Sequence, residues 1–158
     1  MTKNLLAIYL NDHLAGATAG TELARRSRSS NEGSPLGDFL ERLATEIAED
    51  RESLIEVMKR LGIRRDPFKV AAGWGGEKMG RLKLNGQIKG YSPLSRVIEL
   101  EGLHLGITGK LELWRNLERT SGPRLHGIDL EALVKRAETQ RRALAGHRKA
   151  AVEEAFGG

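Results

Sequence analysis

The chain has 158 residues and no cysteine, and 39% of its residues are hydrophobic while only 4% are aromatic. Its 26 Lys and Arg residues against 21 Asp and Glu residues leave a net charge of +5. A length near 150 residues is typical of one domain, and the lack of cysteine excludes disulfide scaffolds and cysteine-based zinc sites. Because few aromatic and β-branched residues are available for sheets, the composition favours an all-α protein.

The first residues do not resemble an export signal or a membrane anchor. The apolar run Leu5–Leu10 is only six residues long, and Asn11 and Asp12 interrupt it. A run of this length is too short for the core of a signal peptide or for a helix that spans a bilayer. We therefore expect a cytoplasmic protein with no membrane segment.

Proline and glycine positions predict where the helices begin and end. Three pairs combine an N-cap residue with proline at the first helical position, namely Ser34-Pro35, Asp66-Pro67 and Ser92-Pro93, and Asp129 is a fourth cap. Left-handed C-terminal caps are predicted at Gly62, Gly86, Gly122 and Gly157. These signals predict four long helices and a shorter one, at residues 3–27, 35–61, 93–119, 130–156 and 67–84 respectively.

Four long helices of nearly equal length are what a four-helix bundle requires. Each would be about 40 Å long at about 1.5 Å per residue. The shorter helix falls in the long connection between the second and third long helices, which permits a crossover to the opposite end of the bundle. An up-down-up-down connectivity stays open at this point. We expect residues 1–158 to form a single helical-bundle domain.

Several ionisable residues occupy positions where helical spacing predicts a buried face. They are His13 on the first helix, Asp50 on the second, and Glu101 and His104 on the third. Glu46, at the edge of the stripe on the second helix, and His147, on the flank of the fourth, are second choices. His13, Asp50, Glu101, His104 and His147 lie in the middle two-thirds of their helices, so we expect them to gather within about 10–12 Å along the bundle axis.

Three uses of this polar centre stay open. Imidazole nitrogens and carboxylate oxygens suit iron, manganese or zinc, and bundle interiors house such metals. Alternatively, His13 pairs with Asp50, and Glu101 pairs with His104 or a buried arginine, in a purely structural network. The third use is a pocket for an organic ligand.

The four long helices, the long middle connection and the motif Glu101-x-x-His104 resemble the ferritin-like four-helix bundles. The resemblance covers most of the chain and implies a metal site in the bundle core. Ferritin-like di-metal proteins carry Glu-x-x-His on two helices and one glutamate on each of the others. Only one such motif stands here, because Leu144 precedes His147. The pattern therefore fits a mononuclear site, or a bundle that has lost its metal, better than a di-iron oxygenase or ferroxidase, and it names no substrate.

Two further functions are alternatives to the metal site. A non-catalytic homodimeric module is the first alternative, because Leu103, Trp114 and Leu117 extend beyond the main apolar stripe and could cover the crossover helix or a second subunit. Nucleic-acid binding through clusters of basic residues is the second. Acidic residues are interspersed in those clusters and no nucleic-acid motif accompanies them, so the sequence favours a solvated basic face.

Overall fold

The computed structural model describes residues 2–72 and 90–158, and all regular structure in that part of the chain is helical. The all-α class is therefore confirmed. The long helices are α1 (Thr2–Ser30), α2 (Pro35–Arg60), α4 (Pro93–Ser121) and α5 (Leu130–Phe156), with a short 3-10 helix, η1 (Gly122–Leu125), before α5. Residues 67–72 are also helical, and the remainder of the predicted helix at 67–84 lies outside the described residues.

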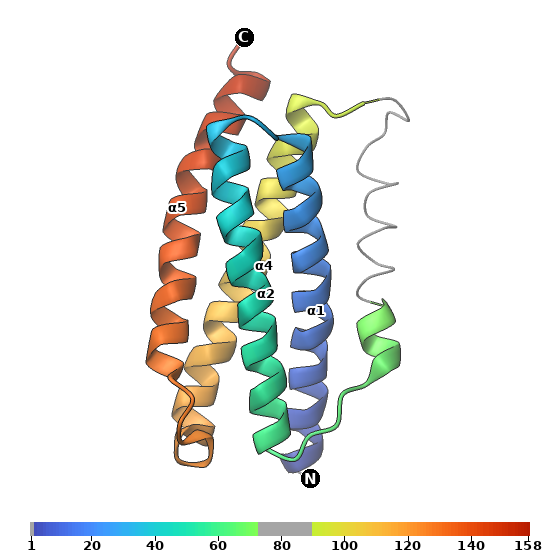
Figure 1. The fold of residues 1–158 in the computed structure, drawn as a ribbon, viewed down its shortest axis with the longest axis vertical. Helices are drawn as coiled ribbons and strands as arrows, with labels where there is room; N and C mark the ends of the chain where they lie inside the picture. Colours follow the sequence, from blue (N-terminus) through green and yellow to red (C-terminus); the bar gives the residue numbers. More distant parts are fainter. Residues whose placement is uncertain (1, 73–89) are drawn as a thin grey trace.

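The four long helices lie side by side as two antiparallel hairpins (Figure 1). The first hairpin joins α1 to α2, the second joins α4 to α5, and these two pairs form the largest helix interfaces. Smaller interfaces join α1 to α4 and α2 to α5. Figure 1 shows that α2 and α4 run in the same direction, which excludes the up-down-up-down connectivity.

The chain that follows α2 is attached to α1 by specific contacts. The side-chain amide of Asn11 donates a hydrogen bond to the carbonyl of Arg64 at 3.1 Å, and its Oδ1 accepts one from the Asp66 backbone N–H at 2.7 Å. Further along, Lys69 Nζ lies 2.7 Å from Asp12 Oδ1. The start of the connection therefore runs beside α1 (Figure 1).

All four predicted N-caps are confirmed. The side chains of Ser34, Asp66, Ser92 and Asp129 each accept a hydrogen bond from a backbone N–H of the following first turn, with closest distances of 2.9–3.1 Å. The first turn of a helix has no internal acceptor for these N–H groups, so the caps define where each helix begins. This local chemistry explains why the predicted starts of α2, α4 and α5 are correct.

The predicted left-handed C-terminal caps need correction. Gly62, directly after α2, has φ +66°, as predicted. Gly122 has φ −45° and Gly157 has φ −88°, so neither is left-handed, and Gly86 lies outside the described residues. After α4 the chain tightens into η1, and its left-handed residue comes later, at Gly127 with φ +87°. A 3-10 turn is an alternative way to end a helix, and a glycine alone does not distinguish the two.

The buried core consists of two apolar clusters that follow one another along the helices. On three helices one inward-facing polar residue lies between the two clusters. These residues are Asp50, between Ile47 and Leu54; Lys110, between Ile107 and Leu111; and Gln140, between Ala137 and Leu144. A polar layer therefore crosses the middle of the core.

The buried face of α4 differs from the predicted one. Glu101, which helical spacing places on the buried face, is exposed, and Leu105 on the same helix is 72% exposed. Leu103, Trp114 and Leu117, proposed as a face for the crossover or a second subunit, are instead buried in the core of this chain. The reason is that α4 carries apolar residues on most sides, so helical spacing alone does not select which arc packs inward.

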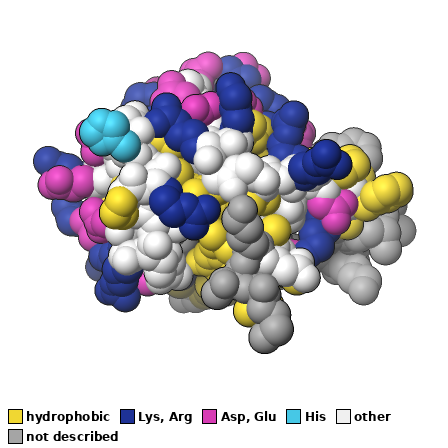
Figure 2. Space-filling model, turned by 90° about the horizontal axis from the view of Figure 1, so that it is seen from below, with side chains coloured by type: hydrophobic (Ala, Val, Ile, Leu, Met, Phe, Trp, Pro, Cys, Tyr) yellow, Lys and Arg dark blue, Asp and Glu magenta, His cyan; other side chains and the backbone are white. Residues whose placement is uncertain are grey.

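The surface at the end that carries the N-terminus mixes charges of both signs (Figure 2). Lys and Arg side chains are spread around this end with Asp and Glu among them, and they do not form one continuous basic face in this view. Within residues 2–72 and 90–158, no helix combines the length and the apolar character needed to cross a bilayer.

The start of α2 offers a test of the hairpin geometry. A Cβ added at Gly37 would lie 2.2 Å from the Asn31 carbonyl oxygen, whereas one added at Gly146 on α5 would meet nothing within 4 Å. We expect Gly37→Ala to lower the free energy of unfolding in urea by about 1–3 kcal/mol through overpacking. Gly146→Ala should raise it by up to about 1 kcal/mol through helix propensity. Equal effects of the two substitutions would contradict this geometry.

Candidate functional site

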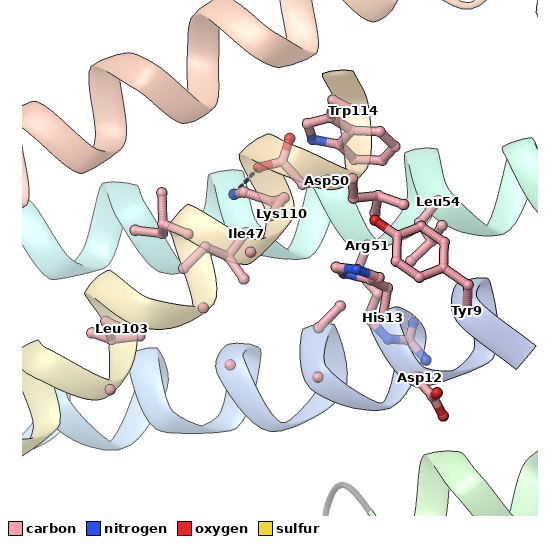
Figure 3. A pocket seen from close by; sticks show the side chains of 18 residues that line it. Tyr9, Asp12, His13, Ile47, Asp50, Arg51, Leu54, Leu103, Lys110 and Trp114 are labelled. Carbon is pink, nitrogen blue, oxygen red and sulfur yellow. Dashed lines mark hydrogen bonds and ion pairs between the residues drawn. The ribbon is translucent and has the colours of Figure 1, made fainter. Parts of the chain in front are cut away.

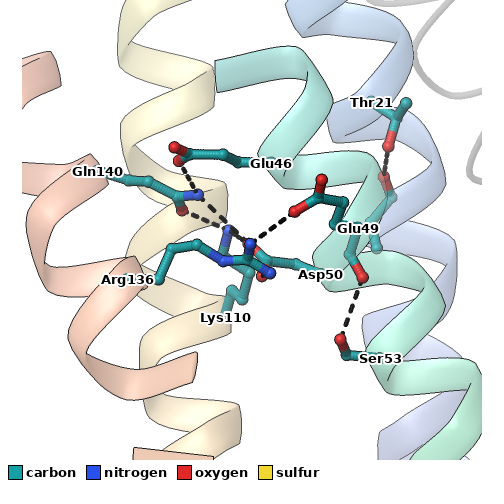
Figure 4. Close-up of polar contacts among 9 residues, drawn as sticks. Thr21, Glu46, Glu49, Asp50, Ser53, Lys110, Arg136 and Gln140 are labelled. Atoms are coloured by element: carbon teal, nitrogen blue, oxygen red, sulfur yellow. Dashed lines mark hydrogen bonds and ion pairs between the residues drawn. The ribbon is translucent and has the colours of Figure 1, made fainter. Parts of the chain in front are cut away.

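The polar layer is built around Asp50 of α2, which is only 2% exposed. Its Oδ2 accepts a hydrogen bond from Lys110 Nζ of α4 at 2.5 Å, and its Oδ1 accepts one from Arg136 Nη2 of α5 at 2.6 Å (Figure 4). Lys110 Nζ also donates to Gln140 Oε1 at 2.6 Å, and the Gln140 amide donates to Glu46 Oε2 at 2.8 Å. One network thus joins three helices.

Burial makes this network sensitive to the loss of any member. Removing charges from water costs several kcal/mol per ion, and a buried pair offsets that cost only when its remaining hydrogen-bonding groups are also satisfied. Both carboxylate oxygens of Asp50 are satisfied here. Burial lowers the pKa of the Lys110 ammonium, and the negative charge of Asp50 opposes that shift.

A cavity of about 310 Å³ lies next to the polar layer, between α1, α2 and α4 (Figure 3). Most of its wall is apolar, and Asp50 and Lys110 add charged groups to it. Five glycines also line it: Gly16 and Gly20 on α1, and Gly102, Gly106 and Gly109 on α4. At four of the five, all but Gly102, an added Cβ would meet no atom within 4 Å. These four glycines therefore do not serve close contact between the helices. Gly20 and Gly109 are half-buried, whereas Gly16 and Gly106 are exposed to solvent.

Other polar side chains line the cavity around His13 and Arg51 (Figure 3). Arg51 Nε donates to Thr18 Oγ1 at 3.1 Å, and its Nη1 lies 2.9 Å from Glu52 Oε1. The ring of His13 packs edge-on against Tyr9, with 4.6 Å between ring centroids. Burial lowers the pKa of His13, with an opposing effect of the neighbouring Asp12 carboxylate.

The structure brings only some of the predicted site residues together. Glu46 and Asp50 belong to one network, linked through Gln140. His13 lines the cavity, but the hydrogen bonds and ion pairs of Asp50 are with Lys110, Arg136 and Gln140, so the predicted pairing of His13 with Asp50 is not found among the described residues.

The other three predicted residues lie elsewhere. Glu101 is on the outer face of α4, where its Oε1 is 4.0 Å from Arg148 Nη2. Burial and the positive charge of Arg148 lower the pKa of His104. His147 stacks on Phe39, with 4.3 Å between ring centroids, and burial lowers its pKa too. In residues 2–72 and 90–158 no three His, Cys, Asp or Glu side chains come together in a group that could hold a metal ion. A site for iron, manganese or zinc stays a prediction.

The site residues predicted from the sequence did not include Lys110, Gln140 or the glycines of the cavity. A signal for Lys110 was present, because Leu103, Ile107, Lys110 and Trp114 follow one another at helical spacings of four, three and four residues. Glycines at 16 and 20, and at 102, 106 and 109, also recur on one side of each helix. Neither pattern is a metal-ligand motif.

The buried carboxylate gives a direct test of the network. Asp50→Ala leaves Lys110 buried without its counter-charge, so we expect it to lower the free energy of unfolding by about 3–5 kcal/mol. The control is Glu49→Ala, which removes the exposed second partner of Arg136 and should cost less than about 1 kcal/mol. Urea unfolding of both variants measures the difference, and similar losses would refute a buried, mutually dependent network.

Three histidines make stability depend on pH. The pKa values of His13, His104 and His147 are all lowered in the folded chain, chiefly by burial. As the pH falls through about 6.5, the unfolded chain therefore binds more protons than the folded one, and folding stability decreases. We expect the free energy of unfolding to fall between pH 7.5 and pH 5.5 (about one unit on either side of that value). Replacing the three histidines with glutamine should make this slope shallower, and an unchanged slope would contradict the assignment.

Comparisons with known proteins leave the site unassigned. No protein-family model, no curated protein and no solved structure matched the chain. The geometry of the cavity and of the polar layer is therefore the basis for a functional proposal.

Proposed function

We propose that this protein binds a small, mostly apolar organic molecule in the cavity between α1, α2 and α4. The observation that carries the proposal is a space of about 310 Å³, walled by apolar side chains and glycines, beside a buried ion pair. Ligand pockets combine apolar walls with a few polar groups in this way. Because a dry cavity of about 150 Å³ holds benzene, this one has room for a molecule of two fused rings.

The glycines that line the cavity support the same proposal. Glycine inside a helix costs about 0.5–1 kcal/mol relative to alanine, and five of them lie on the facing sides of α1 and α4. At Gly16, Gly20, Gly106 and Gly109 a methyl group would meet nothing. Close packing therefore does not require glycine at these positions, and larger side chains at the half-buried Gly20 and Gly109 would narrow the cavity.

We also keep a ferritin-like relationship as a proposal. It is supported by the parallel directions of α2 and α4 and by the long connection between them. A metal site that uses His13, Asp50 or His104 has less support than the organic ligand, because both oxygens of Asp50 already accept hydrogen bonds from Lys110 and Arg136. The homodimer and the cytoplasmic location expected from the sequence also stay proposals. The geometry of the cavity supports neither of them.

Naphthalene is a suitable probe for the cavity, with binding measured by calorimetry. We expect the wild-type chain to bind it, and Gly109→Leu, which places a side chain in the cavity, to raise the Kd by about tenfold or more. The matched control is Gly146→Leu, on the exposed side of α5, where an added Cβ meets nothing within 4 Å. The control should bind naphthalene as the wild type does.

Two results would count against this function. The first is no detectable binding of naphthalene by a folded wild-type chain, with helix content checked by circular dichroism. The second is stoichiometric iron, manganese or zinc in protein purified without chelators, lost in Asp50→Ala, which would favour the metal site instead.

A further inference from the structure

One buried hydrogen-bond donor on the cavity wall has no partner. Trp114 is 1% exposed and lines the cavity, and its indole Nε1 makes no hydrogen bond in the described part of the chain. Figure 3 shows this nitrogen on the edge of the ring directed toward Asp50 and Lys110. A buried donor without an acceptor is unfavourable, and native structures rarely leave one unmatched unless water or a ligand supplies the acceptor.

Lys110 adds a second donor on the same wall. An ammonium group has three N–H bonds, and Lys110 uses one for Asp50 and one for Gln140. The acceptors of the layer, in contrast, are occupied, because both oxygens of Asp50 receive hydrogen bonds. Trp114 and Lys110 both line the cavity, and each therefore retains an N–H without a partner among the described residues.

The charges around the cavity are already balanced. Its lining contains two acidic and two basic side chains, Asp12, Asp50, Arg51 and Lys110. Each has a partner of opposite charge: Asp12 pairs with Lys69, Asp50 with Lys110, and Arg51 with Glu52. A charged ligand would lose its hydration without gaining a free counter-charge, so a neutral ligand is favoured.

From these contacts we propose that the ligand is a neutral, mostly apolar molecule with one carbonyl-type oxygen, which accepts a hydrogen bond from the indole N–H of Trp114. This inference rests on the proposed binding function and narrows it to a chemical class. The apolar body occupies the glycine-lined space, and the oxygen lies against the polar layer.

Calorimetric titrations with three naphthalenes of similar shape test the carbonyl oxygen and the neutral charge separately. The first, 2-acetylnaphthalene, carries the carbonyl; 2-ethylnaphthalene lacks an acceptor; and 2-naphthoate carries a charge. The ratio of the ethyl to the acetyl Kd is measured for the wild type and for Trp114→Phe, so that differences in ligand hydration cancel. We expect this ratio to be about threefold to tenfold larger in the wild type, as one hydrogen bond implies. The naphthoate should bind most weakly.

A spectroscopic readout keeps the test decisive if Trp114→Phe does not fold. The chain has two tryptophans, so Trp74→Phe leaves Trp114 as the source of the single indole N–H resonance. That resonance should move downfield with 2-acetylnaphthalene and respond less to 2-ethylnaphthalene.

The outcomes separate this inference from the binding function. The proposed hydrogen bond is refuted if the ratio of the two Kd values is the same in the wild type and in Trp114→Phe. It is also refuted if 2-acetylnaphthalene and 2-ethylnaphthalene shift the indole N–H resonance equally. Neither result contradicts the binding function. Tightest binding of 2-naphthoate overturns the neutral class. Failure of all three ligands and of naphthalene overturns the binding function.

Discussion

The buried ion pair between Asp50 and Lys110 is the interaction on which the rest of the arrangement depends. Asp50 is almost completely enclosed and draws its partners from two other helices. Since an uncompensated charge in the interior is far more costly than a lost apolar contact, α2, α4 and α5 must keep a relative position in which these side chains meet. The two apolar clusters above and below the layer can vary in detail, because apolar contacts are not directional.

Helix α1 contributes to the core in a different way. At the level of the layer α1 contributes small residues, among them Gly16, Ala17 and Gly20, which line the cavity together with α4. Lys110 of α4 lines the same cavity. The polar layer that joins α2, α4 and α5 therefore also forms the polar wall of the cavity. Asp50 and Lys110 have a structural role and line the proposed binding site.

Sequence reasoning predicted the helices well and the site only in part. Caps such as Ser34 and Asp129 act on neighbouring residues, so their effect is visible in the local sequence. The burial of Asp50 was also predicted, because α2 has one narrow apolar stripe. The outward position of Glu101 was not, since α4 is apolar on several sides. Which residues meet across helices depends on how each helix is rotated, and the spacing within one helix does not contain that information.

Trp114 links the packing of the core to the chemistry of the cavity. Its ring belongs to the apolar cluster that contains Leu54 and Leu111. A phenylalanine at this position would also pack an aromatic ring there, but it would bury no polar group. An indole at a position that is 1% exposed therefore adds an unfavourable donor unless something accepts its hydrogen bond. The indole N–H makes no hydrogen bond to any of the described residues. A ligand oxygen would accept this hydrogen bond, and the apolar body of the same ligand would fill the adjoining space. The glycines, the ion pair and the tryptophan would then all contribute to binding one ligand.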